Sequence, residues 1–279
     1  MSDWGQGVNN NIGWGQGANN DIGWGSIYDK SNAGETLLSG SGFDSDYQAV
    51  LDFATSEGDT LPSANQQILQ NQVVLSLKDK GLWNKKDAFG LFATDGNVDF
   101  ALICWKRLIK MDAINSPSFS ANAGFTGDGT SSYINTKFKP LADGVQFTQD
   151  NAGLSINAGS GSGYIVGNSS TASGNQRMRI GGADTMINGS VLNLNPVFTT
   201  GNTHLDRTSS TELVTQQDNT ITSTRTNNST SLQNNEIFLL RITNNYSNAN
   251  IKAFSARASF TETEKNDYNL IINTYLNAL

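Results

Sequence analysis

From residue 87 onward, short apolar stretches alternate with clusters of Gly, Asn and Ser. The stretches span residues 88–94, 98–106, 131–138, 163–167, 178–180, 212–215, 237–242 and 252–260. Runs of this length, separated by turn-forming residues, are typical of β-strands. Their spacing predicts a β-sandwich, and the DGN at residues 95–97 is expected to be the turn between the first two strands.

Two earlier stretches have helical periodicity instead. Asp44 or Ser45 can cap a helix that ends at Gly58. Ser63 and Gln66 fit a capping box for a second helix, which has a glycine at its C-terminal stop. The apolar stripes of both helices are predicted to face the core.

The C-terminus also reads as a helix. Thr261 and Glu264 fit a capping box at its start. Apolar positions then recur at helical spacing and are expected to form one buried stripe. These positions are Tyr268, Ile271, Ile272, Tyr275, Leu276 and Leu279.

The first 30 residues repeat with a period of ten: WGQGVNNNIG is followed by WGQGANNDIG and then by WGSIYD. Because ten is an even number, an extended backbone would point the large side chains to one side. They are Trp4, Val8, Ile12, Trp14, Ala18, Ile22, Trp24 and Tyr28. A helix would spread the tryptophans around its axis, and each of the seven glycines between Gly5 and Gly25 would cost ~1 kcal/mol relative to Ala. The repeat therefore predicts an extended arm.

A segment this short and glycine-rich cannot bury its own tryptophans. One interpretation is a disordered, sticky leader. The other is an arm whose Trp side chains fill repeated pockets on a partner, while glycine allows close approach of the two backbones. The second is favoured because disordered segments are usually poor in aromatic residues.

Composition narrows the class of protein. The 279 residues are 37% hydrophobic and 15% charged, with 28 glycines against 4 prolines, which fits one large β-sandwich plus a smaller accessory segment. Residues 1–115 hold 8 Lys/Arg and 14 Asp/Glu, and residues 116–279 hold 10 and 11. No basic face for nucleic-acid phosphates is expected.

A membrane-spanning segment and a reactive cysteine are also not expected. No apolar stretch is long enough to span a bilayer, and the N-terminus lacks a signal-peptide pattern, so synthesis in a cytoplasm is expected. The single cysteine, Cys104, lies in the apolar run FALICW and is expected to be a small buried hydrophobe. The predicted organisation is an arm at residues 1–30, a linker at 31–43, a helical segment at 44–86 and a sandwich with a C-terminal helix at 87–279.

Several motifs carry a resemblance to known families. FTGDGTSSYINT (residues 125–136) resembles the first core strand of concanavalin A-like, laminin-G-like sandwiches, and SFTETEKNDY (residues 259–268) resembles the end of that domain. The run from LFATDG to FALICWKRL (residues 91–108), followed by NSPSF and GFTGDG, is similar to virion structural proteins of tailed bacteriophages. Their N-termini often hold the same kind of Trp-Gly and Asn repeat.

The resemblance implies a mainly β protein with a concanavalin A-like jelly-roll sandwich, preceded by the helical segment and the arm. It implies a structural protein of a phage particle, located in the virion as a head fibre, capsid-surface or tail appendage. The arm would bind other virion proteins, of capsid or tail, and the chain would form a homodimer or homotrimer. The alternative is a carbohydrate-binding adhesin module for host-surface glycans, with Tyr164, Phe198 and Tyr246 as candidate contacts that are equally suited to the core.

An enzyme is not expected. Glycoside hydrolysis needs two carboxylates across the scissile bond, whereas Glu212, Glu236, Asp206 and Asp218 stand isolated along the strands. The lone His204 matches the place where laminin-G-like domains often carry a His on a core strand. Its expected role is packing and one hydrogen bond.

A cofactor is not expected either. Asp128, in the GDG turn, is a weak candidate for a calcium ligand, together with backbone carbonyls. Calcium takes six to eight oxygen ligands, and no acidic cluster surrounds this position in the sequence.

Overall fold

The computed structural model describes residues 42–168, 175–182, 184–189, 192–193 and 198–279. Phe43–Leu279 form one compact unit that contains both the helical segment and the strands. The arm at residues 1–30 and nearly all of the linker at 31–43 lie outside the described residues, so the extended form of the arm stays a prediction.

Two antiparallel sheets face each other. Sheet 1 has the order β15-β14-β13-β8-β19-β6-β5, and β1 also pairs with β19. Its strands are β1 (Lys86–Leu91), β5 (Ser118–Ser120), β6 (Gly124–Thr126), β8 (Ala152–Ala158), β13 (Gly201–Arg207), β14 (Glu212–Gln217), β15 (Thr220–Thr226) and β19 (Asn250–Arg257).

Sheet 2 has the order β12-β11-β10-β9-β16-β7-β4. Its strands are β4 (Asp112–Ile114), β7 (Tyr133–Asn135), β9 (Gly163–Asn168), β10 (Asn175–Ile180), β11 (Asp184–Gly189), β12 (Leu192–Asn193) and β16 (Ile237–Leu239). Two short hairpins complete the strands: β2 (Ile103–Cys104) with β3 (Ile109–Lys110), and β17 (Arg241–Ile242) with β18 (Asn245–Tyr246).

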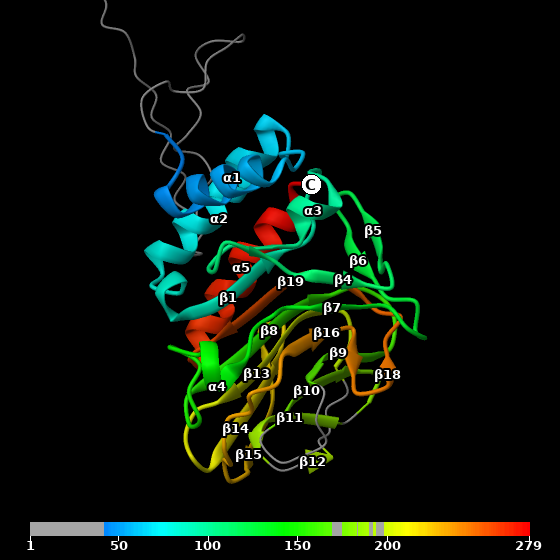
Figure 1. Cartoon of the computed structure of the whole chain (residues 1–279). Coiled ribbons are helices and arrows are strands. Elements are labelled where there is room, and N and C mark those ends of the chain that lie inside the picture. Colours follow the sequence, from blue (N-terminus) through cyan, green and yellow to red (C-terminus); the bar gives the residue numbers. More distant parts are fainter. Residues whose placement is uncertain (1–41, 169–174, 183, 190–191, 194–197) are drawn as a thin grey trace, which may run out of the picture. The chain divides into compact units, whose positions relative to one another are not determined.

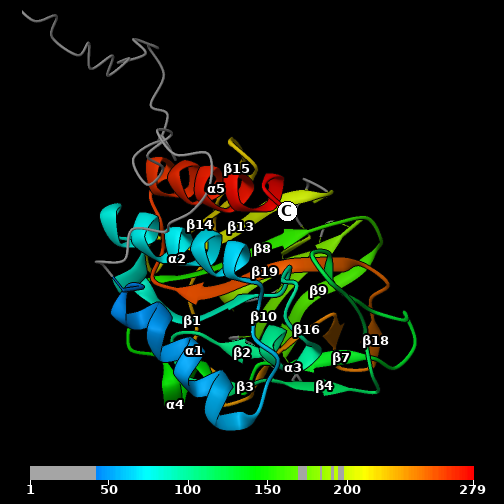
Figure 2. The same cartoon turned by 90° about the horizontal axis from the view of Figure 1, so that it is seen from above.

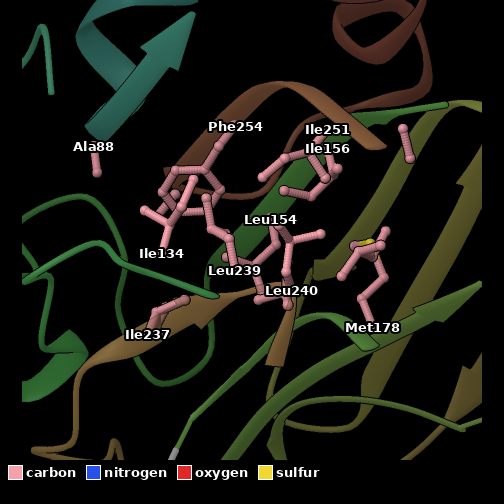
Figure 3. Close-up of a cluster of buried hydrophobic side chains, with 14 of the residues drawn as sticks. Ala88, Ile134, Leu154, Ile156, Met178, Ile237, Leu239, Leu240, Ile251 and Phe254 are labelled. Carbon is pink, nitrogen blue, oxygen red and sulfur yellow. The ribbon is translucent and has the colours of Figure 1, made fainter. Parts of the chain in front are cut away.

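The hydrophobic core lies between the two sheets (Figure 3). Leu154 and Ile156 of sheet 1 meet Met178 and Leu239 of sheet 2 there, and Phe254 packs beside them. Each of these side chains is fully buried. The predicted mainly β sandwich is therefore confirmed, because the period-two apolar positions of both sheets point into one shared interior.

The three long helices lie on the far side of sheet 1 from sheet 2. Helices α2 (Ala64–Asp79) and α5 (Glu262–Asn277) run side by side, and α1 (Ser45–Glu57) packs on α2 (Figures 1 and 2). Gln70 of α2 donates to the Tyr275 hydroxyl of α5 over 3.2 Å. The fold thus has three layers, which are the helices, sheet 1 and sheet 2.

The predicted helix ends are largely confirmed. Asp44 caps α1, and Gly58 ends it with a left-handed φ of 77°. The Thr261 capping box of α5 is complete. Ser63 caps α2, but the Gln66 side chain does not return to the cap and instead accepts from Thr94 Oγ1 at 2.8 Å.

The end of the predicted α5 stripe is wrong. Leu276 is only half-buried, and Leu279 is exposed because it lies after the end of α5 at Asn277 and is no longer held on the helical stripe. The other four positions of the stripe are buried as expected.

The strand predicted at residues 98–106 is also wrong in its first half. Val98–Ala101 form a short helix, α3, and only Ile103–Cys104 are extended. The reason is local, because the Asn97 side chain accepts the backbone N–H of Phe100 and caps a helical turn. The DGN segment therefore leads into a helix, and β1 pairs with the distant β19.

The outer face of sheet 1 is polar and yet buried. Along β8, Leu154 and Ile156 enter the core. Ser155 and Asn157, which alternate with them, point the other way and are also buried. Helix α5 covers this face. His204 shows the contact, since its Nε2 lies 2.6 Å from Asn269 Oδ1 on α5 and its Nδ1 lies 2.8 Å from Ser155 Oγ.

An ion pair stands at the centre of this polar layer. Arg257 Nη1 donates to Asp206 Oδ1 at 2.5 Å, Lys265 of α5 lies 3.6 Å from the other carboxylate oxygen, and all three side chains are buried. Burial alone would raise the pKa of Asp206, but the charges of Arg257 and Lys265 outweigh it and hold the pKa below its usual range. Asp206 also accepts the backbone N–H of Phe260, just before α5 begins.

Gly153 makes room for this ion pair. A Cβ at this position would lie 2.0 Å from Arg257 Nη1 and 2.7 Å from Asp206 Oδ1, closer than real contacts allow. Both atoms belong to the ion pair, so neither can move without loss of their hydrogen bonds. The position therefore requires glycine for space.

We expect Gly153→Ala to lower the free energy of unfolding by roughly 3 kcal/mol, the order of loss seen when a buried ion pair is broken. Urea unfolding followed by circular dichroism measures this change. Gly42→Ala is the matched control, since nothing lies within 4 Å of its added methyl group. Equal stability of the two variants would show that the ion pair tolerates displacement.

Lys86 belongs to the same polar layer but, unlike Arg257 and Lys265, has no carboxylate partner among the described residues. Its Nζ lies 3.2 Å from Ser255 Oγ and 4.4 Å from the centre of the Tyr268 ring. Burial, and then the nearby charge of Arg257, hold the pKa of Lys86 well below its ordinary value. Between this lowered pKa and pH 10.5, the amine is therefore neutral in the folded protein and protonated in the unfolded chain.

We expect Lys86→Met to raise the free energy of unfolding at pH 7 by roughly 1 kcal/mol or more. The unfolded chain binds the Lys86 proton below pH 10.5 and the folded protein does so only at lower pH, so the wild type loses stability as pH falls through this window. The gain should therefore be larger at pH 7 than at pH 10 in urea unfolding. A loss at pH 7 would mean that Lys86 is charged in the folded protein.

Candidate functional site

The outer face of sheet 2 carries the candidate site. Ile165 of β9 and Met178 of β10 point into the core, so their neighbours Tyr164, Arg177 and Arg179 project from the opposite face. Among the described residues, the long helices α1, α2 and α5 lie on the far side of sheet 1 and do not cover this face (Figures 1 and 2). Two groups of aromatic and arginine side chains form on it.

The first group surrounds Asp184 of β11. The Tyr164 hydroxyl donates to Asp184 Oδ2 at 2.6 Å, and Arg177 Nη1 lies 3.1 Å from the same oxygen. The Arg179 guanidinium lies 5.3 Å from the centre of the Tyr164 ring. Burial raises the pKa of Tyr164, and so does its hydrogen bond to Asp184.

The second group surrounds Arg241 of β17. Its guanidinium lies 4.3 Å from the centre of the Tyr133 ring, 5.0 Å from Phe238 and 5.4 Å from Tyr246. Tyr133 and Phe238 also pack edge to face, with ring centres 5.2 Å apart. Arg241 Nε donates to the backbone carbonyl of Thr243, which fixes the plane of the guanidinium.

Gly167 of β9 connects the two groups. Phe238 is its register partner on one side and Arg177 on the other, so these residues lie about 10 Å apart, two strand spacings of ~4.8 Å. The β17–β18 hairpin folds over Gly167. A Cβ there would lie 2.6 Å from both the Arg241 carbonyl oxygen and Ile242 Cβ.

Two arginines of this face lack a carboxylate partner. Arg107, Arg177 and Arg257 each bind an aspartate, whereas neither Arg179 nor Arg241 lies within 4 Å of an acidic group in the described part of the chain. In addition, Arg177 Nε, Arg179 Nε and Asp184 Oδ1 are buried and have no hydrogen-bond partner there. Unsatisfied polar atoms are unusual in folded proteins and mark places where a ligand could supply the missing bonds.

Two of the three predicted glycan contacts lie on this face. Tyr164 and Tyr246 are half-buried and each is stacked with an arginine. The prediction for Phe198 is wrong, because this side chain is fully buried in the core and cannot contact a ligand from there. Sequence reasoning missed Tyr133, and it missed the arginines because only the fold brings them beside the rings.

Asp128 organises its own loop. Its Oδ1 accepts the backbone N–H groups of Thr130, Ser131 and Ser132 at 2.8–2.9 Å, and Oδ2 accepts the Ser131 hydroxyl. These hydrogen bonds hold the pKa of Asp128 far below its usual range. Among the described residues, no three His, Cys, Asp or Glu side chains lie close enough together to hold a metal ion.

The remaining residues with catalytic chemistry are separated or inaccessible. Ser155, His204 and Asp206 lie under α5 with no exposed surface. Burial lowers the pKa of His204 to about 3, with the charge of Arg257 adding to the effect. The same histidine makes three hydrogen bonds rather than the one expected, with Ser155, Asn269 and Arg257. Cys104 is buried, and burial raises the pKa of its thiol.

The carboxylates weighed for glycoside hydrolysis do not form a pair. Glu212 begins β14 in sheet 1 and bonds Thr208, whereas Glu236 precedes β16 in sheet 2 and bonds Asn135. Asp206 is engaged in the buried ion pair, and Asp218 accepts the backbone N–H of Asn202. Each of these groups therefore has a structural partner.

A polar cleft of about 420 Å³ lies beside the start of α5, and Lys85, Asn151 and Thr261 are among its lining residues. Two of its polar side chains have partners within the chain, since Lys85 binds Glu264 and Asn151 accepts from Ser259. No helix in the described part of the chain is long and apolar enough to cross a membrane.

No protein-family model matches this chain, and no curated protein is similar to it in sequence. Among solved structures, the botulinum neurotoxin serotype D binding domain is similar at 9% identity and a TM-score of 0.42, over 66% of this chain and 51% of that one. Trypanosoma rangeli sialidase in complex with sialic acid is similar at 10% identity and a TM-score of 0.43, over 75% and 39%. The chain spans about half of the first protein and two-fifths of the second, and we draw no functional conclusion from likenesses this distant.

We expect Gly167→Ala to displace the β17–β18 hairpin and to cost about 1–3 kcal/mol, as overpacking of a close contact does. The core of sheet 1 should stay intact, because the main contacts of the hairpin are with β9 and β16 of sheet 2. Hydrogen exchange should therefore accelerate at the hairpin amides and remain unchanged in β8 and β13. Unchanged exchange at the hairpin would mean that it does not rest on Gly167.

Proposed function

We propose that this chain is a structural protein of a bacteriophage particle, held in the virion by residues 1–30 and displaying the sandwich of Phe43–Leu279. The observation that carries the proposal is the ten-residue Trp repeat, joined to a body that folds as a unit of its own. The repeat leaves its tryptophans without a core of their own, and a capsid or tail surface would supply one. Symmetric homo-oligomers, dimers or trimers, fit this role.

The sandwich acts in this proposal as a binding module without catalysis. Support comes from the burial of Ser155, His204 and Asp206 and from the position of Glu212 and Glu236 in different sheets. Glycoside hydrolysis needs two carboxylates on either side of one bond. The groups that could serve are occupied by structural hydrogen bonds.

A second candidate function is recognition of host-surface glycans by the outer face of sheet 2. It is favoured by one observation, the stacking of Tyr164, Tyr133 and Tyr246 with arginines on that face. Aromatic rings beside polar groups are the usual means of sugar binding. The two functions are compatible, because attachment uses residues 1–30 and recognition uses the sandwich.

Replacement of Trp4, Trp14 and Trp24 by Ala tests the attachment proposal. Each buried anchor contributes roughly 2–4 kcal/mol at an interface, so loss of all three should remove the protein from purified particles. The readout is the amount of this chain per particle, by quantitative mass spectrometry.

The matched control replaces Asn9, Asn10 and Asn11 by Ser, which changes the same segment and keeps its large side chains. This control should be incorporated at the wild-type level. Circular dichroism should show the same sandwich in all three proteins. Incorporation of the Trp variant at the wild-type level would refute the anchoring role.

A further inference from the structure

We propose that the outer face of sheet 2 binds an acidic saccharide, with Arg179 and Arg241 as the groups that bind its carboxylates. This inference rests on the second candidate function and specifies its ligand. Its basis is that the face gathers three of the chain's seven arginines, Arg177, Arg179 and Arg241, in a protein of net charge −7. Only Arg177 is neutralised by an aspartate within the described residues.

The stacked arginines are prepared to bind carboxylates. The ring of Tyr133 covers one side of the Arg241 guanidinium at 4.3 Å, and its Nε is held by the carbonyl of Thr243. A guanidinium fixed in this way presents its terminal N–H groups with little loss of side-chain entropy. Carboxylates bind such a fork through two parallel hydrogen bonds.

Arg179 offers a second point of the same kind. It stacks on Tyr164, and its Nε is buried without a hydrogen-bond partner. The neighbouring atoms Arg177 Nε and Asp184 Oδ1 are also without hydrogen-bond partners. The two arginine nitrogens need an acceptor, and the aspartate oxygen needs a donor. A saccharide carries groups of both kinds, since its carboxylate accepts and its hydroxyl groups donate, and it can approach because Arg177 and Arg179 are only half-buried.

The layout favours a chain molecule over a single small anion. Two arginine–tyrosine groups flank Gly167, and their nearest strand positions, Phe238 and Arg177, lie about 10 Å apart. A polymer with repeated carboxylates can engage both groups at once, which raises its affinity above that of either contact alone. Rings beside each arginine suit sugar faces better than the flexible side chains of an acidic peptide.

Binding of the full chain to polygalacturonate, a linear polymer of a uronic acid, tests the proposal. Calorimetry should show binding that weakens with added salt. The methyl ester of the same polymer lacks the charge and should bind at least about tenfold more weakly, because the charge-assisted hydrogen bonds are lost. Polyglutamate of equal charge should also bind more weakly, because it has no sugar rings to stack.

Substitutions of Arg179 and Arg241 test whether these residues form the binding site. Arg179→Gln together with Arg241→Gln should reduce affinity for polygalacturonate by about a hundredfold, roughly tenfold for each arginine. Conversion of both to Lys keeps the charge without the planar fork, so an intermediate loss is expected. Arg225→Gln removes one positive charge on the exposed edge strand β15 of sheet 1, is the matched control for each single Gln variant of the site, and should leave affinity unchanged. Thermal unfolding confirms that each variant is folded.

The outcomes separate this inference from the function beneath it. Equal affinity for the acid and its ester, lost in the double Gln variant, would keep glycan recognition and overturn acid specificity. Equal affinity for polyglutamate would show a general polyanion surface and overturn the saccharide. No binding to either saccharide, or an unchanged affinity in the double Gln variant, would overturn the proposed site, while attachment through residues 1–30 would stand.

Discussion

The buried ion pair between Asp206 and Arg257 is the interaction on which the arrangement of layers depends. A carboxylate deprived of water is stable only where cations and N–H donors replace its hydration, and here Arg257, Lys265 and the Phe260 amide do so. These groups come from β13, β19, the start of α5 and the segment that leads to it. Because the pair can form only when all four are in place, it fixes the helix on the sheet, and Gly153 leaves the space in which it forms.

This polar layer gives the sandwich two different outer faces. Sheet 1 uses its outer face for structure, with buried histidine, asparagine and serine side chains, of which His204 and Asn202 bond to α5. Within the described residues, the β17–β18 hairpin lies over the outer face of sheet 2, and tyrosines and arginines lie beside it. Ser155, His204 and Asp206 are thus closed to solvent on one side of the sandwich, and the stacked tyrosines and arginines lie on the opposite side. The proposals of a binding role rest on this division.

The sequence was most informative where the determining interactions are local. The Thr261 capping box and the Asp44 and Gly58 ends involve residues a few positions apart, and all were predicted correctly. Residues 98–106 misled because the apolar run matches a strand, while the cap from Asn97 selects a helical turn. The polar positions of β8 and β13 alternate as solvent-facing residues would, and nothing local reveals that α5 covers them. Phe198 and Tyr164 looked equivalent in sequence, and only the pairing of distant strands places one in the core and the other on the surface.

The single histidine allows a direct measurement of the buried layer. Asn269 Nδ2 donates to Asp218 and Asn219, so Asn269 Oδ1 accepts from His204 Nε2, and His204 Nδ1 accepts from Arg257 Nη2. The ring is therefore assigned as neutral, with its proton on Nε2. Burial and the charge of Arg257 lower its pKa to about 3, so the unprotonated form should persist through the usual titration range. Nitrogen-15 NMR of histidine-labelled protein should show one neutral tautomer, unchanged from pH 8 to about pH 4. A titration with a midpoint near 6.5 would show that the ring reaches water and that α5 does not seal this face of the sheet.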